Sequence, residues 1–314
     1  MRGTICTLFE GHHHYGVGAL VNSLYLHGYR GTIWAGYRGG ELPFWARNAK
    51  RGAHGWDYSP AEGLTVCFFE ENPPHHYSAQ KPAWLRKVLL ELEPGAEAAF
   101  YFDPDIVVKC RWSFFEEWAA HGIALCEDVT CMPETHPIRL GWEQVLTDWG
   151  YTPQQRLRAH FNAGFIGIRR DCMEILDTWE SIVSKLKTGL SNHHTMCFGD
   201  RDNPFQHPYQ DAMNMACMAT KLSLSWAGRD AMDFEIRGYI MSHAINEPKP
   251  WRMFSFFRAL FSRLTPTRAE RQYWNYVTAP IRLFPGWLWA LKRLDLIAAQ
   301  IVGRIYSQNS PGNF

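Results

Sequence analysis

Short apolar runs rich in β-branched and aromatic residues alternate with segments of helical spacing along most of the chain. Such alternation builds βαβ units, in which each crossover returns the chain to a neighbouring parallel strand. The sequence therefore predicts an α/β fold with a mostly parallel central sheet. The runs predicted as strands are residues 4–9, 32–35, 64–69, 98–102, 123–126 and 163–168. The segments predicted as helices are 17–26, 84–92, 112–120, 171–187 and 210–220, with irregular chain at 127–162 and 190–207.

Residues 251–314 differ in composition from the rest of the chain. They contain nine Lys and Arg against two Asp and Glu, a net charge of +7, which leaves −6 for residues 1–250 within the total of +1. Bulky aromatic residues accompany these charges, and Pro266, Pro280 and Pro285 interrupt the segment. We predict two units, a domain of residues 1–250 and a basic, aromatic, α-helical extension of residues 251–314.

The composition excludes several classes of protein. An apolar fraction of 46% and a charged fraction of 20% exclude a disordered chain, and no run of about 18 apolar residues is present to cross a bilayer. The eight cysteines are scattered without a Cys-x-x-Cys pair, which predicts mostly buried thiols in a reducing compartment. The first residues lack the apolar core of a signal peptide. We expect a cytoplasmic protein, at most peripheral on the inner face of a membrane.

Asp103, Pro104 and Asp105 directly follow the apolar run 98–102. Ligands of open α/β sheets bind outside the carboxyl ends of the strands, and two carboxylates beside a rigid proline offer hard oxygen ligands to Mn²⁺ or Mg²⁺ carrying a diphosphate. The alternative is a surface turn, because Asp and Pro are frequent turn residues. Paired charges at the mouth of a buried strand favour a compensating cation.

His243 and Lys249 form a second candidate group, in a loop that Pro248 and Pro250 stiffen. The imidazole could serve the same metal, and the lysine could meet a phosphate as a point charge. A lone histidine is more often structural, and that alternative stays open.

Six groups of residues, in a fixed order over residues 3–255, carry a resemblance to a known family. They are Thr7-Leu8 with Tyr15 to Leu24, Lys81-Pro82 with Leu85, Asp103-Pro104-Asp105, Phe161 to Phe165, Gln210 to Asn214, and His243 with Lys249-Pro250-Trp251. In this order and spacing the chain resembles the family 8 glycosyltransferases, which include glycogenin and the bacterial galactosyl- and glucosyltransferases of lipopolysaccharide synthesis. The resemblance implies a GT-A fold, a UDP-sugar donor, retention of the anomeric configuration and a divalent cation, usually Mn²⁺.

The resemblance also implies roles for individual residues. Asp103, Asp105 and His243 would ligate the metal, and Lys249 would contact the diphosphate. Residues implied in donor binding are Leu8, Phe9, Glu10 and Tyr15 near the uridine, with Tyr15 stacking on uracil, and Lys81, Asn162 and Gly164. Residues implied in catalysis are Asp128, with Glu127 as the alternative acid near the donor sugar, and Gln210 or Asp211, one of which would stabilise an oxocarbenium-like centre.

Two positions depart from the family pattern. Tyr209 stands where the family has an Asp before Gln210, so the side-chain oxygen that faces the anomeric carbon stays open between Gln210 and Asp211. Asn246 stands where the late motif has a Gly, and Asn tolerates positive φ better than most residues. The histidine runs at residues 12–14, 75–76 and 193–194 are interpreted as loop residues.

The expected acceptor is a hydroxyl of a saccharide or of a lipid-linked sugar. Trp287, Leu291, Leu294, Ala298, Ile301 and Ile305 fall on one helical face of the extension. This face could bind an anionic membrane surface through residues 251–308, or it could pack on protein. We expect no nucleic-acid partner, because the aromatic residues accompany aliphatic ones and no binding motif is present.

Two other functions compete with the transferase hypothesis. A sugar-phosphate nucleotidyltransferase would also use a nucleotide-binding α/β sheet and a metal, but residues 16–20 lack the basic residues expected after its glycine-rich loop. A catalytically silent, nucleotide-sugar-binding partner is the alternative from a non-enzyme class. The metal and phosphate residues argue against it, while Tyr209 keeps it open.

Overall fold

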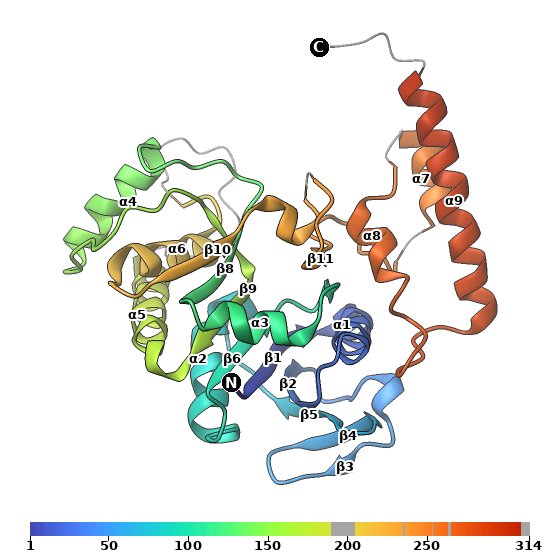
Figure 1. Cartoon of the computed structure of the whole chain (residues 1–314), viewed down its shortest axis with the longest axis horizontal. Coiled ribbons are helices and arrows are strands. Elements are labelled where there is room, and N and C mark those ends of the chain that lie inside the picture. Colours follow the sequence, from blue (N-terminus) through green and yellow to red (C-terminus); the bar gives the residue numbers. More distant parts are fainter. Residues whose placement is uncertain (190–204, 235, 253, 263–264, 309–314) are drawn as a thin grey trace.

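A computed structural model describes residues 1–189, 205–234, 236–252, 254–262 and 265–308. The fold is α/β, built on a nine-stranded sheet with the order β10-β8-β9-β6-β1-β2-β5-β4-β3 and on a separate two-stranded ribbon, β7-β11 (Figure 1). The strands are β1 (Gly3–Glu10), β2 (Gly31–Arg38), β3 (Lys50–Arg51), β4 (Trp56–Ala61), β5 (Leu64–Glu70), β6 (Ala98–Phe102), β7 (Ile106–Val108), β8 (Ile123–Glu127), β9 (Phe161–Arg169), β10 (Leu224–Ala227) and β11 (Met241–His243).

The central sheet is mostly parallel. Seven of its nine strands run in one direction, and β4 and β9 are reversed. Because β9 runs backwards between β6 and β8, it begins at the edge of the sheet where β1, β6 and β8 end. Polar residues that follow these three strands and those that open β9 therefore meet at one edge.

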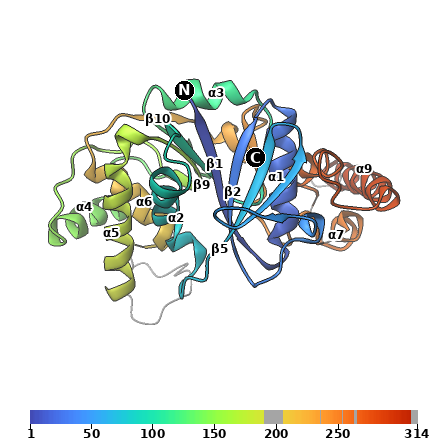
Figure 2. The same cartoon turned by 90° about the horizontal axis from the view of Figure 1, so that it is seen from below.

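Helices cover both faces of the sheet, and each face has its own apolar core. Figure 2 shows α2, α4, α5 and α6 on one side of the sheet and α1 on the other. The helices are α1 (His14–Leu26), α2 (Lys81–Lys87), which continues as a π-helical turn at Val88–Leu92, α3 (Trp112–Ala119), α4 (Pro137–Asp148), α5 (Glu174–Gly189), α6 (Pro208–Ala219), α7 (Ser255–Ser262), α8 (Arg268–Tyr273) and α9 (Gly286–Gln308).

The predicted strands and helices of the α/β core are confirmed, with shifts of a few residues at their ends. The prediction of an irregular stretch at 127–162 is wrong for residues 137–148, which form α4. His136 caps this helix by accepting a hydrogen bond from the Ile138 amide, and Pro137 occupies its first turn, where a missing N–H costs nothing. The predicted loop at 190–207 lies largely outside the described residues, as do His193 and His194.

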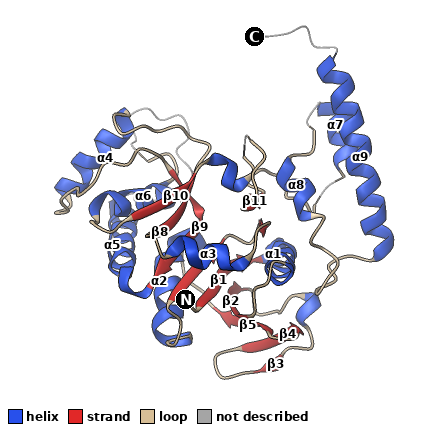
Figure 3. Ribbon diagram, in the orientation of Figure 1, coloured by secondary structure: helices blue, strands red, loops and turns tan. Residues whose placement is uncertain are grey.

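The extension is joined to the core of the domain by its central part. The Asn22 side chain of α1 donates to the carbonyls of Tyr276 and Ile281 at 2.7 and 2.8 Å and accepts from the Ile281 amide at 2.7 Å. Leu283 packs on Gly18 so closely that a Cβ there would lie 2.4 Å from its side chain. Beyond these contacts, α7 and α9 stand out from the sheet as a helical pair (Figure 3). The boundary at residue 250 stays a prediction.

The structure also bears on the expectations about membrane-spanning helices and about the cysteines. Within the described residues, no helix combines the length and the apolarity needed to cross a membrane. The seven cysteines of the described part are free thiols, and five of them are buried (Cys6, Cys67, Cys126, Cys172 and Cys217).

Candidate functional site

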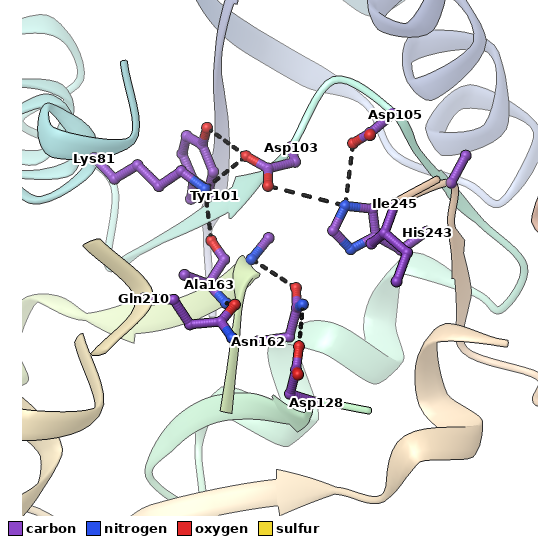
Figure 4. A network of polar contacts seen from close by, with 12 residues as sticks. Lys81, Tyr101, Asp103, Asp105, Asp128, Asn162, Ala163, Gln210, His243 and Ile245 are labelled. Carbon is purple, nitrogen blue, oxygen red and sulfur yellow. Dashed lines mark hydrogen bonds and ion pairs between the residues drawn. The ribbon is translucent and has the colours of Figure 1, made fainter. Parts of the chain in front are cut away.

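The carboxylates of Asp103 and Asp105 lie at the carboxyl end of β6, whose five residues are all buried. The strand ends in a tight turn, in which the Ile106 amide donates to the Asp103 carbonyl at 3.1 Å. The Asp103 amide donates to the Gly164 carbonyl of β9 at 2.7 Å, which fixes the turn to the neighbouring strand. Figure 4 shows both carboxylates facing the same space.

His243 reaches these carboxylates through the β7-β11 ribbon. The ribbon pairs His243 with Ile106, next to Asp105, and the Ala244 amide donates to the Asp105 carbonyl at 3.0 Å. The imidazole Nε2 lies 3.1 Å from Oδ1 of Asp105 and 3.9 Å from Oδ2 of Asp103. The ribbon thus brings the two candidate groups of the sequence into one cluster.

This cluster has the donor set and the spacing of a divalent-cation site. One ligand atom from each of Asp103, Asp105 and His243 lies within 4.8 Å of the others. Ligands about 2.1 Å from an octahedral ion lie about 3 Å apart when adjacent and about 4.2 Å apart when opposite, so the three atoms need move little to share one ion. Two carboxylates with one neutral imidazole suit Mg²⁺ or Mn²⁺ and do not select between them.

A buried lysine contacts one oxygen of each carboxylate. We call this the outer oxygen, and we call the oxygen nearer to His243 the inner oxygen. Lys81 Nζ lies 2.7 Å from Oδ1 of Asp103, and Lys249 Nζ lies 2.8 Å from Oδ2 of Asp105. Backbone carbonyls of Ala163 and Ala244 hold the two ammonium groups at 2.8 and 2.9 Å. Each aspartate therefore keeps one oxygen for a cation while its other oxygen is bound to a lysine.

The side chain of Asp105 is ionised at neutral pH. Burial by itself would raise its pKa, but the neighbouring His243 and Lys249 outweigh burial and hold the pKa below its ordinary value. The carboxylate form is the one that ligates metal ions.

Two glycines let the surrounding backbone approach the cluster. A Cβ on Gly164 would lie 2.4 Å from Cε1 of His243, and a Cβ on Gly16 would lie 2.2 Å from the Pro104 carbonyl oxygen. Any larger residue at position 164 would displace the imidazole. The structure therefore gives Gly164, predicted as a donor-binding residue, a packing role beside His243.

Asp128, Asn162 and Gln210 form a second polar group at the start of β9, next to the cluster (Figure 4). Asn162 donates to Oδ2 of Asp128 at 2.6 Å and accepts from the Gly164 amide at 2.8 Å. Gln210 of α6 accepts from the Ala163 amide at 3.0 Å. Burial would raise the pKa of Asp128, but the hydrogen bonds from Asn162 and Thr130 lower it overall. Glu127 instead faces Arg229, at 3.5 Å.

Asp211 follows Gln210 on α6 and is 1% exposed. Its carboxyl accepts from the His207 amide at 2.9 Å, and burial raises its pKa to about 8. The carboxyl is therefore largely protonated at neutral pH, unlike that of Asp128. Tyr209, one residue before the predicted Gln210, stacks on His76 at a centroid distance of 6.2 Å.

Of the predicted uridine residues, Leu8, Phe9 and Glu10 lie at the end of β1 and Tyr15 lies in the first turn of α1. Each is buried or has a partner within the protein. Leu8 and Phe9 are buried, 3% and 4% exposed, which leaves little of either residue open to a ligand. Glu10 pairs with Arg38 at 2.9 Å. Tyr15 stacks on Phe284 of the extension, with centroids 5.2 Å apart and planes at 9°. Stacking of Tyr15 on a base stays a prediction and would require its other face.

Two contacts of the site were not expected from the sequence. Tyr101 donates to Oδ1 of Asp103 at 2.8 Å; it lies two residues before Asp103 on a strand, where alternate side chains share a face, so this contact was readable from the spacing. Trp251 donates to Nδ1 of His12 at 2.9 Å and so joins the loop after β1 to the loop of Lys249. That pairing of distant loops left no signal in the sequence.

Comparisons with known proteins give structural likenesses alone. No family model matches the sequence, and no curated protein matches it. The glycosyltransferase GlyE of Streptococcus pneumoniae TIGR4 is similar over 96% of this chain and 64% of its own, with 13% identity and a TM-score of 0.49. The apo structure of the bifunctional glycosyltransferase WbbM is similar over 88% and 51%, with 14% identity and a TM-score of 0.47. This chain spans less than two thirds of the length of either structure.

Proposed function

We propose that the chain is a metal-dependent, retaining glycosyltransferase that moves a hexose from a UDP-sugar to a hydroxyl of a saccharide or glycolipid. The observation that supports this most is the cluster of Asp103, Asp105 and His243, with Lys81 and Lys249 on its two sides. The resemblance in sequence to the family 8 enzymes adds the donor class. It also suggests bacterial surface glycans such as lipopolysaccharide as the destination of the sugar.

The charges of the cluster favour a ligand that arrives with its cation. Two carboxylates and two lysines sum to zero, and an imidazole that ligates a cation must be neutral and so adds nothing. A divalent cation bound there would leave a net charge of +2, which complements the two negative charges of a nucleoside diphosphate ester. The metal and the diphosphate would therefore stabilise each other's binding.

Each side chain has a role in the proposed reaction. A divalent cation held by Asp103, Asp105 and His243 would supply charge neutralisation for the departing diphosphate. Lys249 would hold a phosphate oxygen, and Lys81 would hold Asp103 in the orientation that ligates the metal.

The donor sugar would lie against Asn162 and Asp128 at the start of β9. Asp128 fixes the Asn162 amide, because both of its oxygens accept hydrogen bonds, from Asn162 and from the Thr130 amide. Between Gln210 and Asp211, we assign the stabilisation of the oxocarbenium-like centre to Gln210, because Asp211 is buried and largely protonated.

We favour front-face attack over a double displacement. The acceptor oxygen forms its bond to the anomeric carbon on the face from which UDP departs, and the acceptor proton passes to the leaving phosphate oxygen. Retention follows without a protein nucleophile. This route agrees with the engagement of Asp128 in two hydrogen bonds and with the protonated state of Asp211.

The test is a panel of UDP-sugars incubated with the full chain and Mn²⁺, with UDP release as the readout. Release that depends on the metal and on one sugar supports the proposal. Pyrophosphate release from UTP and a sugar 1-phosphate would instead identify a nucleotidyltransferase. Binding of UDP without turnover of any donor, with or without acceptor sugars, would identify a silent partner protein.

A further inference from the structure

Helix α9 is inverted relative to a normal surface helix. Its buried face carries two charged residues, Lys292 and Asp295, beside Leu296 and Ala299. Its outer face carries a stripe of apolar residues that are 46% to 69% exposed: Trp287, Leu291, Leu294, Ile297, Ile301 and Ile305. An amphipathic helix usually buries such a stripe against the core. We call these six residues the α9 stripe.

The inversion is fixed by a buried polar network between α7, α8 and α9. Asp295 caps α7 by accepting from the amides of Ser255 and Phe256, both at 2.8 Å, and receives Lys292 Nζ at 2.9 Å. Glu270 of α8 pairs with Arg258 of α7 and accepts from the Ser255 hydroxyl. Rotating α9 to bury its stripe would break these bonds and leave the amides of Ser255 and Phe256 without the carboxylate that caps them.

Helix α7 adds to the same apolar surface. Phe257 and Phe261, one turn apart on α7, are 59% and 78% exposed and stack on each other. The helix lies along α9, and the pair stands clear of the sheet (Figure 1). The exposed apolar residues thus belong to a raised part of the molecule, which a flat partner can reach.

The surface charge of the extension is positive. Its two acids, Glu270 and Asp295, are both buried, 5% and 8% exposed, and both are bonded in the network described above. Exposed cations include Arg252, Arg282 and Arg293, and Arg293 lies on α9 one residue before Leu294 of the stripe. An apolar stripe beside Arg293, on an extension whose exposed charges are positive, complements an anionic, apolar partner.

A second copy of this chain fits the surface poorly. A symmetric dimer through the α9 stripe would place two extensions, each with a net charge of +7, against one another without exposed acids to pair with them. Within the described residues, no helix can cross a bilayer. These observations favour a partner with an extended surface, on which α9 lies, over a second copy of the chain.

We propose that α7 and α9 dock the protein on an anionic phospholipid bilayer, with the α9 stripe in the interface and exposed arginines of the extension at the lipid phosphates. Trp287 would sit at headgroup depth, where an indole has both an apolar and a polar neighbourhood. The proposal does not depend on the transferase reaction, because docking involves none of the metal or donor residues.

Cosedimentation of the full chain with vesicles of phosphatidylcholine that contain phosphatidylglycerol tests whether the α9 stripe enters the bilayer interface. Leu294→Glu, on the stripe, should lower the partition coefficient by about tenfold or more. Leu140→Glu is the matched control, because Leu140 is also an exposed leucine of a helix, 45% exposed on α4, remote from the extension. Equal binding of the two variants would overturn the proposal.

The charged half is tested with a double variant and with lipid composition. Arg282→Gln with Arg293→Gln should weaken binding by roughly 25-fold, about fivefold for each charge, while Arg47→Gln with Lys50→Gln, two exposed cations of the domain, should leave it unchanged. Binding should weaken with salt and be lost on pure phosphatidylcholine. Equal binding to neutral vesicles would contradict the proposal. So would a dimer in lipid-free buffer that Leu294→Glu dissociates, which would assign the stripe to a second copy.

Discussion

Lys249 and His243 hold opposite oxygens of one carboxylate, that of Asp105: the lysine Nζ lies 2.8 Å from Oδ2 and the imidazole Nε2 lies 3.1 Å from Oδ1. The same division recurs at Asp103, between Lys81 and His243. The inner oxygens and the imidazole are therefore available to one cation, while the lysines balance the charge of the ligands. This balance makes the effects of single substitutions predictable.

Asp105→Asn should lower Mn²⁺ affinity at least about 100-fold and abolish donor turnover. The substitution replaces a charged metal ligand with a neutral amide, and it leaves Lys249 without the carboxylate that it pairs with. Calorimetric titration of Mn²⁺ measures the first effect, and UDP release measures the second. Glu134→Gln, an exposed acid in a loop, is the charge-matched control. Full activity of Asp105→Asn in the presence of a chelator would contradict the assignment.

Lys249→Met should move two affinities in opposite directions. Removing the cation should strengthen binding of Mn²⁺ alone several-fold, because the ligand charges are no longer balanced. It should weaken UDP binding in saturating Mn²⁺ by about tenfold or more, because a phosphate contact is lost. Both are read by calorimetry, with Lys50→Met as the exposed control. A fall of both affinities together would show that Lys249 only supports the fold of the site.

The sequence predicted the acidic turn and the strand before it because β6 is an uninterrupted apolar run that ends in Asp103-Pro104-Asp105. The meeting of His243 with Asp105 was implied only by the resemblance to the family 8 enzymes. Periodicity could not show it, because the contact depends on β7 and β11, three residues each, which are too short for a periodic pattern. The pairing of each lysine with the outer oxygen of a carboxylate is likewise set by the tertiary fold alone.

The apolar pattern was an incomplete guide to two helices. Helix α4 was missed because it buries few side chains, Arg139, Trp142 and Leu146, although they follow helical spacing. The face of α9 was visible in the sequence, but periodicity alone left open whether the face packs on protein or meets a membrane. The burial of Lys292 and Asp295 decides which face points inward, and their pairing partners lie on α7 and α8.

Gly164→Ala should disturb the proposed metal site without removing a ligand. The new methyl group would lie 2.4 Å from Cε1 of His243 and 2.7 Å from Oδ1 of Asn162, so the imidazole must move. We expect Mn²⁺ affinity to fall by roughly tenfold and the free energy of unfolding to fall by about 1 to 3 kcal/mol. Gly286→Ala is the control, because a Cβ there meets no atom within 4 Å. Unchanged metal affinity would contradict the role of His243.

The buried Asp211 predicts how stability depends on pH. Its pKa is raised to about 8 in the folded protein, against about 3.9 in the unfolded chain. The folded state therefore keeps a proton that the unfolded state releases, and the stabilising contribution, complete below about pH 4, is lost as the pH rises toward 8. His160, with a pKa lowered to about 4 by burial, changes stability only below about pH 6.5.

Between pH 6.5 and 8 the wild type should therefore lose about 1 to 2 kcal/mol of stability relative to Asp211→Asn. Urea denaturation in metal-free buffer at several pH values measures the difference.

The Asp211→Asn variant should also keep donor turnover within a few-fold, whereas Gln210→Ala should lose it. Parallel stability profiles, or an inactive Asp211→Asn that folds normally, would show that the carboxylate form of Asp211 is the one the protein uses.

Asn22→Ala tests whether the extension and the domain unfold together. The Asn22 amide is fully buried and makes three hydrogen bonds to the backbone of Tyr276 and Ile281. Its removal leaves buried carbonyls and an amide without partners, which should cost about 2 to 4 kcal/mol. Asn48→Ala, at an exposed position, is the control. Because these bonds join α1 to the chain between α8 and α9, we expect urea denaturation to show one transition that moves to lower urea as a whole. Separate transitions, with only one of them shifted, would show that the extension is an independent unit.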